Sequence, residues 1–63
     1  MSKYYEVIGT IDGQDEVLFG SFLRSDCLYE LDADRWWYQA EGYKGLTIKS
    51  RLTSETPDPE VYA

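Results

Sequence analysis

Histidine is absent from the 63-residue sequence, and cysteine occurs only once. Without histidine, the commonest general base near neutral pH is missing. A single cysteine excludes a disulfide within the chain and a structural zinc site built from cysteine and histidine. No apolar run approaches the ~18–20 residues that span a membrane, and no basic segment followed by an apolar stretch indicates a secretory signal. We therefore expect a cytoplasmic protein with no metal, cofactor, small-molecule substrate or membrane contact.

Basic residues are also scarce, since six Lys and Arg stand against twelve Asp and Glu, a formal net charge of −6. Phosphate binding needs clustered bases, so we expect no direct nucleic-acid binding. The chain is nevertheless 43% hydrophobic and 16% aromatic, which is too apolar for a disordered segment. The hydrophobic core of so short a chain stabilises the folded state by only a few kcal/mol. Because disulfides are excluded and a metal site is not expected, we expect self-association or a protein partner to supply further stability.

The first third of the chain predicts a β-hairpin. Residues 4–11 and 16–23 are rich in aromatic and β-branched side chains, which are typical of strands. The Asp12-Gly13 pair between them is a strong signal for a type I′ turn. One face of this hairpin is expected to form the core and the other to be semi-apolar. The core face would hold Tyr5, Val7, Ile11, Leu18 and Phe22, and the second face Tyr4, Ile8, Val17 and Phe19.

Residues 25–41 contain neither proline nor glycine and predict a helix, with Ser25 as its N-cap and Gly42 just past its end. Residues 46–53 alternate apolar and polar side chains, as a half-buried strand does. The apolar set of this strand, expected to point to the core, is Leu46, Ile48 and Leu52.

These segments predict a small α+β fold of the ββαβ type. A helical crossover makes the third strand parallel to the second, and both are then antiparallel to the first. The simplest arrangement is a three-stranded antiparallel sheet in the order 2-1-3 with one helix packed on one face. Residues 1–53 would form this single domain. Residues 54–63, with both prolines and three acids, would form a flexible C-terminal tail.

Two apolar stripes follow the predicted helix, each within an arc of about 100°. The first is a normal core stripe and consists of Cys27, Leu28, Leu31 and Tyr38. The second is not required for packing on a small sheet, and consists of Tyr29, Ala33, Trp36, Trp37 and Ala40. Exposed aromatics of this number form a patch of the kind that marks interaction sites, so we predict that the second stripe binds a partner. Two alternatives stay open: the aromatics serve as bulky core around the sheet edge or under the tail, or the two stripes exchange roles.

Charge is segregated along the sequence. Residues 26–41 carry five acids and one base, whereas residues 44–53 carry three bases and no acid. An acidic helix and a basic strand could pair in duplicate across a two-fold dimer. A second hypothesis reads the acidic face of Glu30, Asp34 and Glu41 as a mimic of DNA phosphates. In size and acidity, though in no motif, the chain resembles small accessory proteins of bacteriophages and plasmids.

Catalytic chemistry has little support in the sequence. Cys27 falls in the first helical turn, where the helix dipole lowers a thiol pKa, but it lies in the apolar stripe and lacks a histidine partner, so a buried structural thiol is favoured. We expect no enzyme. The prediction is a small non-catalytic protein-interaction module that forms a homodimer, docks a protein partner, or does both, through the aromatic helix stripe. The alternative is an acidic, DNA-mimic-like inhibitor of a nucleic-acid-binding host enzyme.

Overall fold

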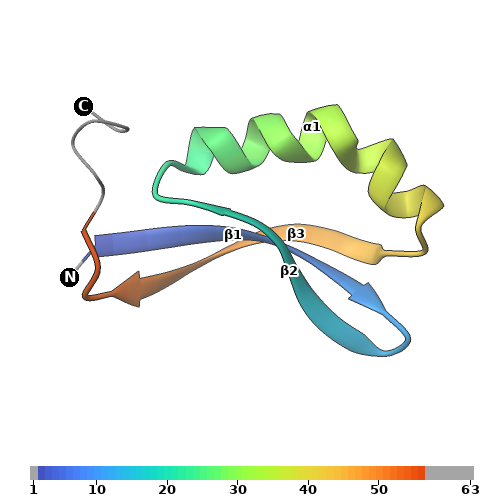
Figure 1. The fold of residues 1–63 in the computed structure, drawn as a ribbon, viewed down its shortest axis with the longest axis horizontal. Helices are drawn as coiled ribbons and strands as arrows, with labels where there is room; N and C mark the ends of the chain where they lie inside the picture. Colours follow the sequence, from blue (N-terminus) through green and yellow to red (C-terminus); the bar gives the residue numbers. More distant parts are fainter. Residues whose placement is uncertain (1, 57–63) are drawn as a thin grey trace.

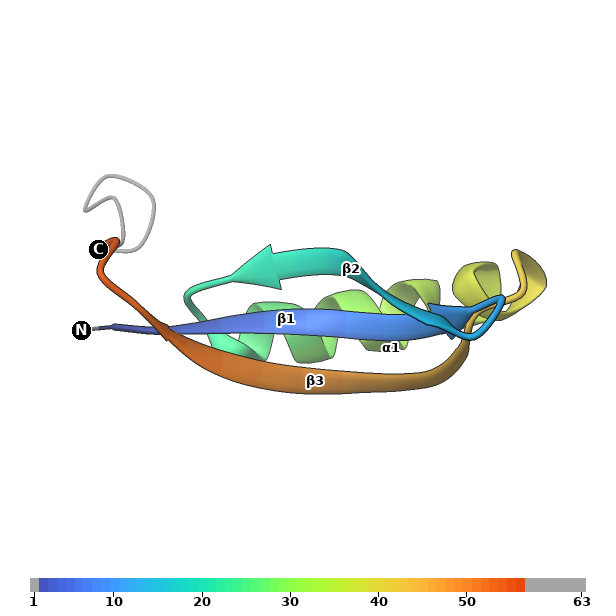
Figure 2. The same cartoon turned by 90° about the horizontal axis from the view of Figure 1, so that it is seen from below.

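The computed structural model describes residues 2–56, and four elements account for most of them. In chain order these are β1 (Ser2–Ile11), β2 (Gln14–Ser21), α1 (Arg24–Ala40) and β3 (Lys44–Thr53). The strands form one sheet in the order β2-β1-β3, and β1 is antiparallel to both neighbours (Figure 2). The predicted ββαβ fold, strand order and single helix are confirmed. Residues 57–63, most of the predicted tail, lie outside the described residues.

Helix α1 covers one face of the sheet, and no other described element covers the opposite face (Figure 1). The core lies between these two layers. Val7 and Cys27 are fully buried and Leu31 is nearly so. Partly buried hydrophobic side chains complete this core, namely Tyr5, Leu18, Phe19, Leu46 and Ile48.

The turn between β1 and β2 has the expected conformation. Asp12 and Gly13 both have positive φ, 51° and 77°, as a two-residue type I′ turn requires. Ile8 therefore pairs with Val17, but the register then shifts, and Val7 pairs with Phe19. The irregularity is a β-bulge, which places two residues of one strand opposite one of the other.

This bulge corrects the predicted faces of β2. Phe19 was expected on the second face, yet it packs against the core beside Leu18. Phe22 was expected in the core, yet its ring contacts Tyr4 edge-on, with centroids 5.0 Å apart. The cause is the period of two along a strand, because one inserted residue exchanges the faces of everything beyond it.

Tyr4 organises the open face of the sheet. The Tyr4 ring lies directly over Gly20, where an added Cβ would overlap it. The guanidinium carbon of Arg51 lies 5.0 Å from the Tyr4 ring centroid, and Arg51 Nε is 3.5 Å from Glu6 Oε1. A cation–π contact and a partly exposed ion pair therefore fix Arg51 on this face.

Strand β3 departs from the prediction at its far end. Leu46 and Ile48 pack against the core as expected, but Leu52 is 63% exposed. Leu52 pairs with Lys3 near the start of β1. In Figure 1 this end of the sheet reaches past the first turn of α1. Leu52 lies at this end of the sheet, which is why the period-two pattern overestimated its burial.

The start of α1 differs from the prediction, because Ser25 is not the N-cap. The helix begins at Arg24, and Leu23 occupies the cap position in an extended conformation without a side-chain cap bond. The nearly buried Ser21 anchors this end instead. Its hydroxyl accepts a hydrogen bond from the Leu23 N–H at 3.0 Å and donates one to Asp26 Oδ2 at 2.8 Å. Sequence spacing alone favoured the nearer serine.

The end of α1 is a Schellman motif centred on Gly42, as its position in the sequence suggested. Gly42 has a φ of 104°. Its N–H donates to the Gln39 carbonyl at 3.1 Å, and the Tyr43 N–H donates to the Tyr38 carbonyl at 3.0 Å. These two bonds satisfy the last carbonyls of the helix and turn the chain into β3.

Candidate functional site

The five residues predicted to bind a partner form one surface, which we call the aromatic face: Tyr29, Ala33, Trp36, Trp37 and Ala40. All five are exposed in the structure. The exposed fraction is 79% for Tyr29, 69% for Trp36 and 47% for Trp37. Large aromatic side chains are seldom left this open unless a partner covers them.

The buried side of α1 is the first stripe, so the two stripes do not exchange roles. Cys27, Leu31 and Tyr38 are the buried residues of the helix. Leu28 was expected with them but is 43% exposed, because it lies at the edge of its arc. Three strands under one helix need only a narrow stripe of side chains. The aromatic face is therefore left over after the core has been built.

Trp37 differs from its neighbours because it is tied to the core. Its ring meets the Tyr38 ring edge-on, with centroids 5.6 Å apart, and Tyr38 meets Tyr43 in the same manner at 6.3 Å. Edge-to-face contacts of this kind stabilise aromatic pairs modestly. Contact with Tyr38 thus fixes Trp37 at one edge of the aromatic face. Tyr29 and Trp36 are the more exposed residues of this face.

The acidic face of Glu30, Asp34 and Glu41 is not uniformly presented. Glu30 and Asp34 are half-buried, and Glu41 is exposed. A hydrogen bond with Asp34, partial desolvation and the charge of Asp34 raise the pKa of Glu30, against the hydrogen bond from Tyr38. The Tyr38 hydroxyl donates to Glu30 Oε2 at 3.2 Å, and desolvation followed by the charge of Glu30 raises the pKa of Tyr38. The first two acids are thus engaged with the protein itself.

Two acidic side chains at the hairpin tip also accept hydrogen bonds from within the chain. The Thr10 hydroxyl donates to Asp15 Oδ1 at 2.6 Å, and the Tyr43 hydroxyl donates to Glu16 Oε2 at 2.7 Å. The bond to Glu16 is the main cause that raises the pKa of Tyr43. The first bond lies within the hairpin, and the second joins the hairpin to the residue that precedes β3.

Cys27 is placed as a structural thiol. It is fully buried, and desolvation, followed by the negative charge of Asp26, raises the pKa of its thiol. A buried, protonated thiol is a poor nucleophile. Within residues 2–56, no group of three or more acidic or thiol side chains is arranged to hold a metal ion. Over the same span, no helix is long and apolar enough to cross a membrane.

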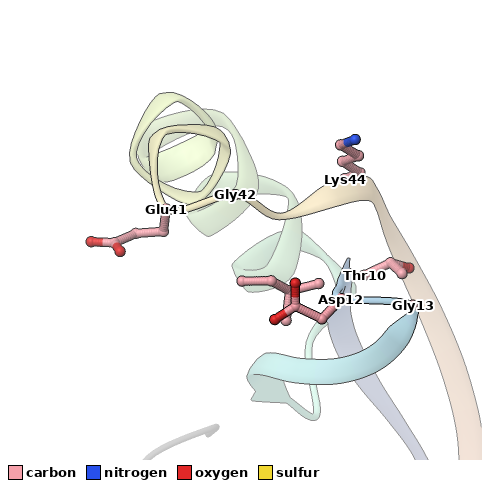
Figure 3. Close-up of a pocket in the computed structure, with 7 residues that line it drawn as sticks. Thr10, Asp12, Gly13, Glu41, Gly42 and Lys44 are labelled. Atoms are coloured by element: carbon pink, nitrogen blue, oxygen red, sulfur yellow. The ribbon is translucent and has the colours of Figure 1, made fainter.

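A cleft of about 430 Å³ lies between the hairpin tip and the end of α1. Thr10, Asp12, Glu41 and Lys44 supply its polar side chains. In Figure 3 the Glu41 side chain extends away from Asp12, and Lys44 points away from both. Because these groups diverge, the cleft offers no set of donors and acceptors aimed at one ligand.

Two further apolar side chains are exposed, of which the sequence predicted Val17 and missed Leu23. Leu23 is 44% exposed beside the start of α1, and Val17 is 57% exposed on the open face of β2. Val17 pairs with Ile8 across the hairpin, which the strand period had placed outside the core. No sequence signal distinguished Leu23, because its exposure depends on how the chain enters the helix.

The fold and this surface define a small ββαβ protein whose aromatic helix face is exposed among residues 2–56. No family model, curated protein or solved structure matches the chain.

Proposed function

We propose that this protein is a non-catalytic protein-interaction module that binds through the aromatic face of α1. The observation that carries the proposal is the exposure of Tyr29 and Trp36, 79% and 69% of their surfaces. Trp and Tyr are enriched among the residues that dominate binding energy at interfaces. Their backbone is already fixed in a helix that packs on the core, so binding has to order only their side chains.

The aromatic face also has a suitable border. Asp32, Arg35 and Gln39 are exposed along one side of it, and Glu41 on the other. Apolar anchors inside a polar rim are the usual anatomy of a protein-binding surface. A location in a reducing compartment fits the single buried thiol, and the cytoplasm stays the compartment that we propose.

The acidic face gives the DNA-mimic hypothesis less support. A phosphate mimic needs ionised carboxylates that project into solvent. Glu30 and Asp34 are half-buried instead, and the contact between them raises the pKa of Glu30. An enzyme recognising three phosphates in a row would meet one freely exposed carboxylate, that of Glu41.

The test compares association of the wild-type chain with that of matched variants. Association with itself is measured by sedimentation equilibrium, and association with other proteins by capture on the tagged chain. We expect the double variant Trp36→Ala, Trp37→Ala to lose whichever association the wild-type chain shows. Glu30→Gln and Val17→Ala should keep this association. Val17 is 57% exposed but lies on the face of the sheet that α1 does not cover, so its loss controls for the removal of an exposed apolar side chain. Association that survives the double variant, or no association of either kind, would contradict the proposal.

A further inference from the structure

Large and small side chains alternate along four of the five residues of the aromatic face, and the fifth, Trp37, lies at its edge. Tyr29, Ala33, Trp36 and Ala40 are separated by four, three and four residues, a spacing that keeps them on one side of a helix. Each large aromatic residue is thus followed along the surface by an alanine. Such a row of projections and gaps fits a second row of the same spacing when large residues face small ones.

We propose that the occupant of the aromatic face is a second copy of this chain, with the two α1 helices packed antiparallel. The proposal rests on the proposed function and names its partner. The two-fold axis passes between Asp34 and Arg35. Tyr29 then lies opposite the partner's Ala40, and Ala33 lies opposite the partner's Trp36. Each pair occurs twice, because a two-fold interface uses the same surface on both copies.

Antiparallel packing is the orientation that this spacing fits. Parallel helices in register would set Trp36 against its own copy and Ala33 against its own copy, which gives overlap at one level and a gap at the next. Antiparallel packing also brings the positive end of each helix dipole near the negative end of the other.

On one side of the aromatic face, the charged residues are arranged as an antiparallel dimer requires. Asp32 and Arg35 are both exposed there, and the two-fold axis brings Asp32 within one helical turn of the partner's Arg35, and the reverse. On the other flank Glu30 approaches the partner's Glu41. Glu41 is exposed and Glu30 is half-buried, so this pair opposes the dimer, and salt weakens the repulsion beyond about 10 Å at 0.1 M.

The three aromatic rings supply about half of the area that a specific dimer needs. From their exposed fractions, Tyr29, Trp36 and Trp37 together offer about 450 Å². A standard interface buries about 800 Å² from each partner, so the three rings supply about half of it. The alanines and the stems of the rim residues surround them.

The first experiment exchanges the large residue Trp36 and the small residue Ala33, which face each other in the proposed dimer. Trp36→Ala leaves a hole opposite Ala33 and should weaken dimerisation at least about 30-fold. Ala33→Trp sets two tryptophans against each other and should weaken it as well. The double variant Ala33→Trp, Trp36→Ala restores a large residue opposite a small one at both levels, and should recover most of the lost affinity in sedimentation equilibrium. Both positions are exposed, so thermal melts serve to confirm that each variant folds.

The second experiment measures orientation. Spin labels are attached to single cysteines at Ser25→Cys or Gln39→Cys, while the buried Cys27 is left in place. With a rise of ~1.5 Å per residue, antiparallel packing separates the two Ser25 positions by about 29 Å along the axis and the two Gln39 positions by about 14 Å. Parallel packing would give the same distance at both positions.

The outcomes separate this inference from the proposed function. Affinity rescued by the double variant, with unequal label distances, supports the antiparallel dimer. A wild-type chain that stays monomeric at every concentration, a double variant as weak as the single ones, or equal label distances would overturn it. Capture of another protein that depends on Trp36 and Trp37 would then leave the interaction module standing with a different occupant.

Discussion

Trp36→Ala should scarcely change the stability of the monomer, whereas Leu31→Ala, on the same helix, should damage it. Trp36 is 69% exposed and Leu31 is 7% exposed. The covered third of a Trp side chain is about 80 Å², worth at most about 2 kcal/mol at ~25 cal/mol/Å². The helix's own turns supply part of that cover, and alanine has the higher helix propensity by roughly 0.5 kcal/mol. The net loss should therefore stay below about 1 kcal/mol.

Leu31→Ala instead leaves a cavity beside Val7 and Cys27, for which a loss of about 2–5 kcal/mol is typical. Urea unfolding followed by far-UV circular dichroism gives both values, and the lowest usable protein concentration isolates the monomer. At higher concentration the wild-type midpoint should rise, because dimerisation stabilises the folded state, while that of Trp36→Ala stays constant. If Trp36→Ala lost as much stability as Leu31→Ala, the monomer would bury this indole, and the aromatic face would not be exposed.

Three further substitutions or reactions test other parts of the structure. Because contact with Asp34 raises the pKa of Glu30 above 4.5, the folded state binds the extra proton, and stability should fall as the pH rises from 4.5 through the raised pKa. Glu30→Gln should remove this fall, which urea midpoints between pH 4 and 7 would show; an unchanged pH dependence would contradict it. Gly20→Ala should lower stability by about 1 kcal/mol, because its Cβ displaces the Tyr4 ring from its contacts with Phe22 and Arg51, and a thermal melt equal to wild type would be inconsistent with those contacts. Cys27 should react with a thiol reagent only as fast as the protein opens, so immediate labelling in native buffer would show that it is not buried.

Much of the fold was predictable because its signals are local. The Asp12-Gly13 turn demands positive φ at two successive residues, which few other pairs tolerate. Gly42 ends the helix for a similar reason. Once these points fix the element order, the crossover rule leaves few ways to arrange three strands.

The errors arose where a distant contact decided the outcome. The bulge that brings Phe19 to the core and Phe22 to Tyr4 depends on the pairing of two strands, which one strand's pattern does not reveal. Leu52 has the right period for the core but lies beyond the reach of α1. Ser21 anchors the helix in place of Ser25 because the path out of β2 brings its hydroxyl to the first turn.

The aromatic face was predictable as a set of residues, since the helical period groups Tyr29, Trp36 and Trp37 without any tertiary information. Whether the chain covered them was not predictable, because that depends on the size and position of the sheet. The acidic face shows the reverse case. Its spacing is regular, but burial and the contact between Glu30 and Asp34 change what those carboxylates present to solvent.

Tryptophan fluorescence reports whether the aromatic face is open in the monomer, because both tryptophans of the chain lie on it. In dilute solution we expect the emission of water-exposed indoles, readily quenched by acrylamide. As the chain is concentrated, the emission should shift to shorter wavelength and become protected from the quencher as the face is covered. Blue-shifted, protected emission already present in the dilute monomer would mean that the chain itself covers both indoles and that no aromatic face is exposed for a partner.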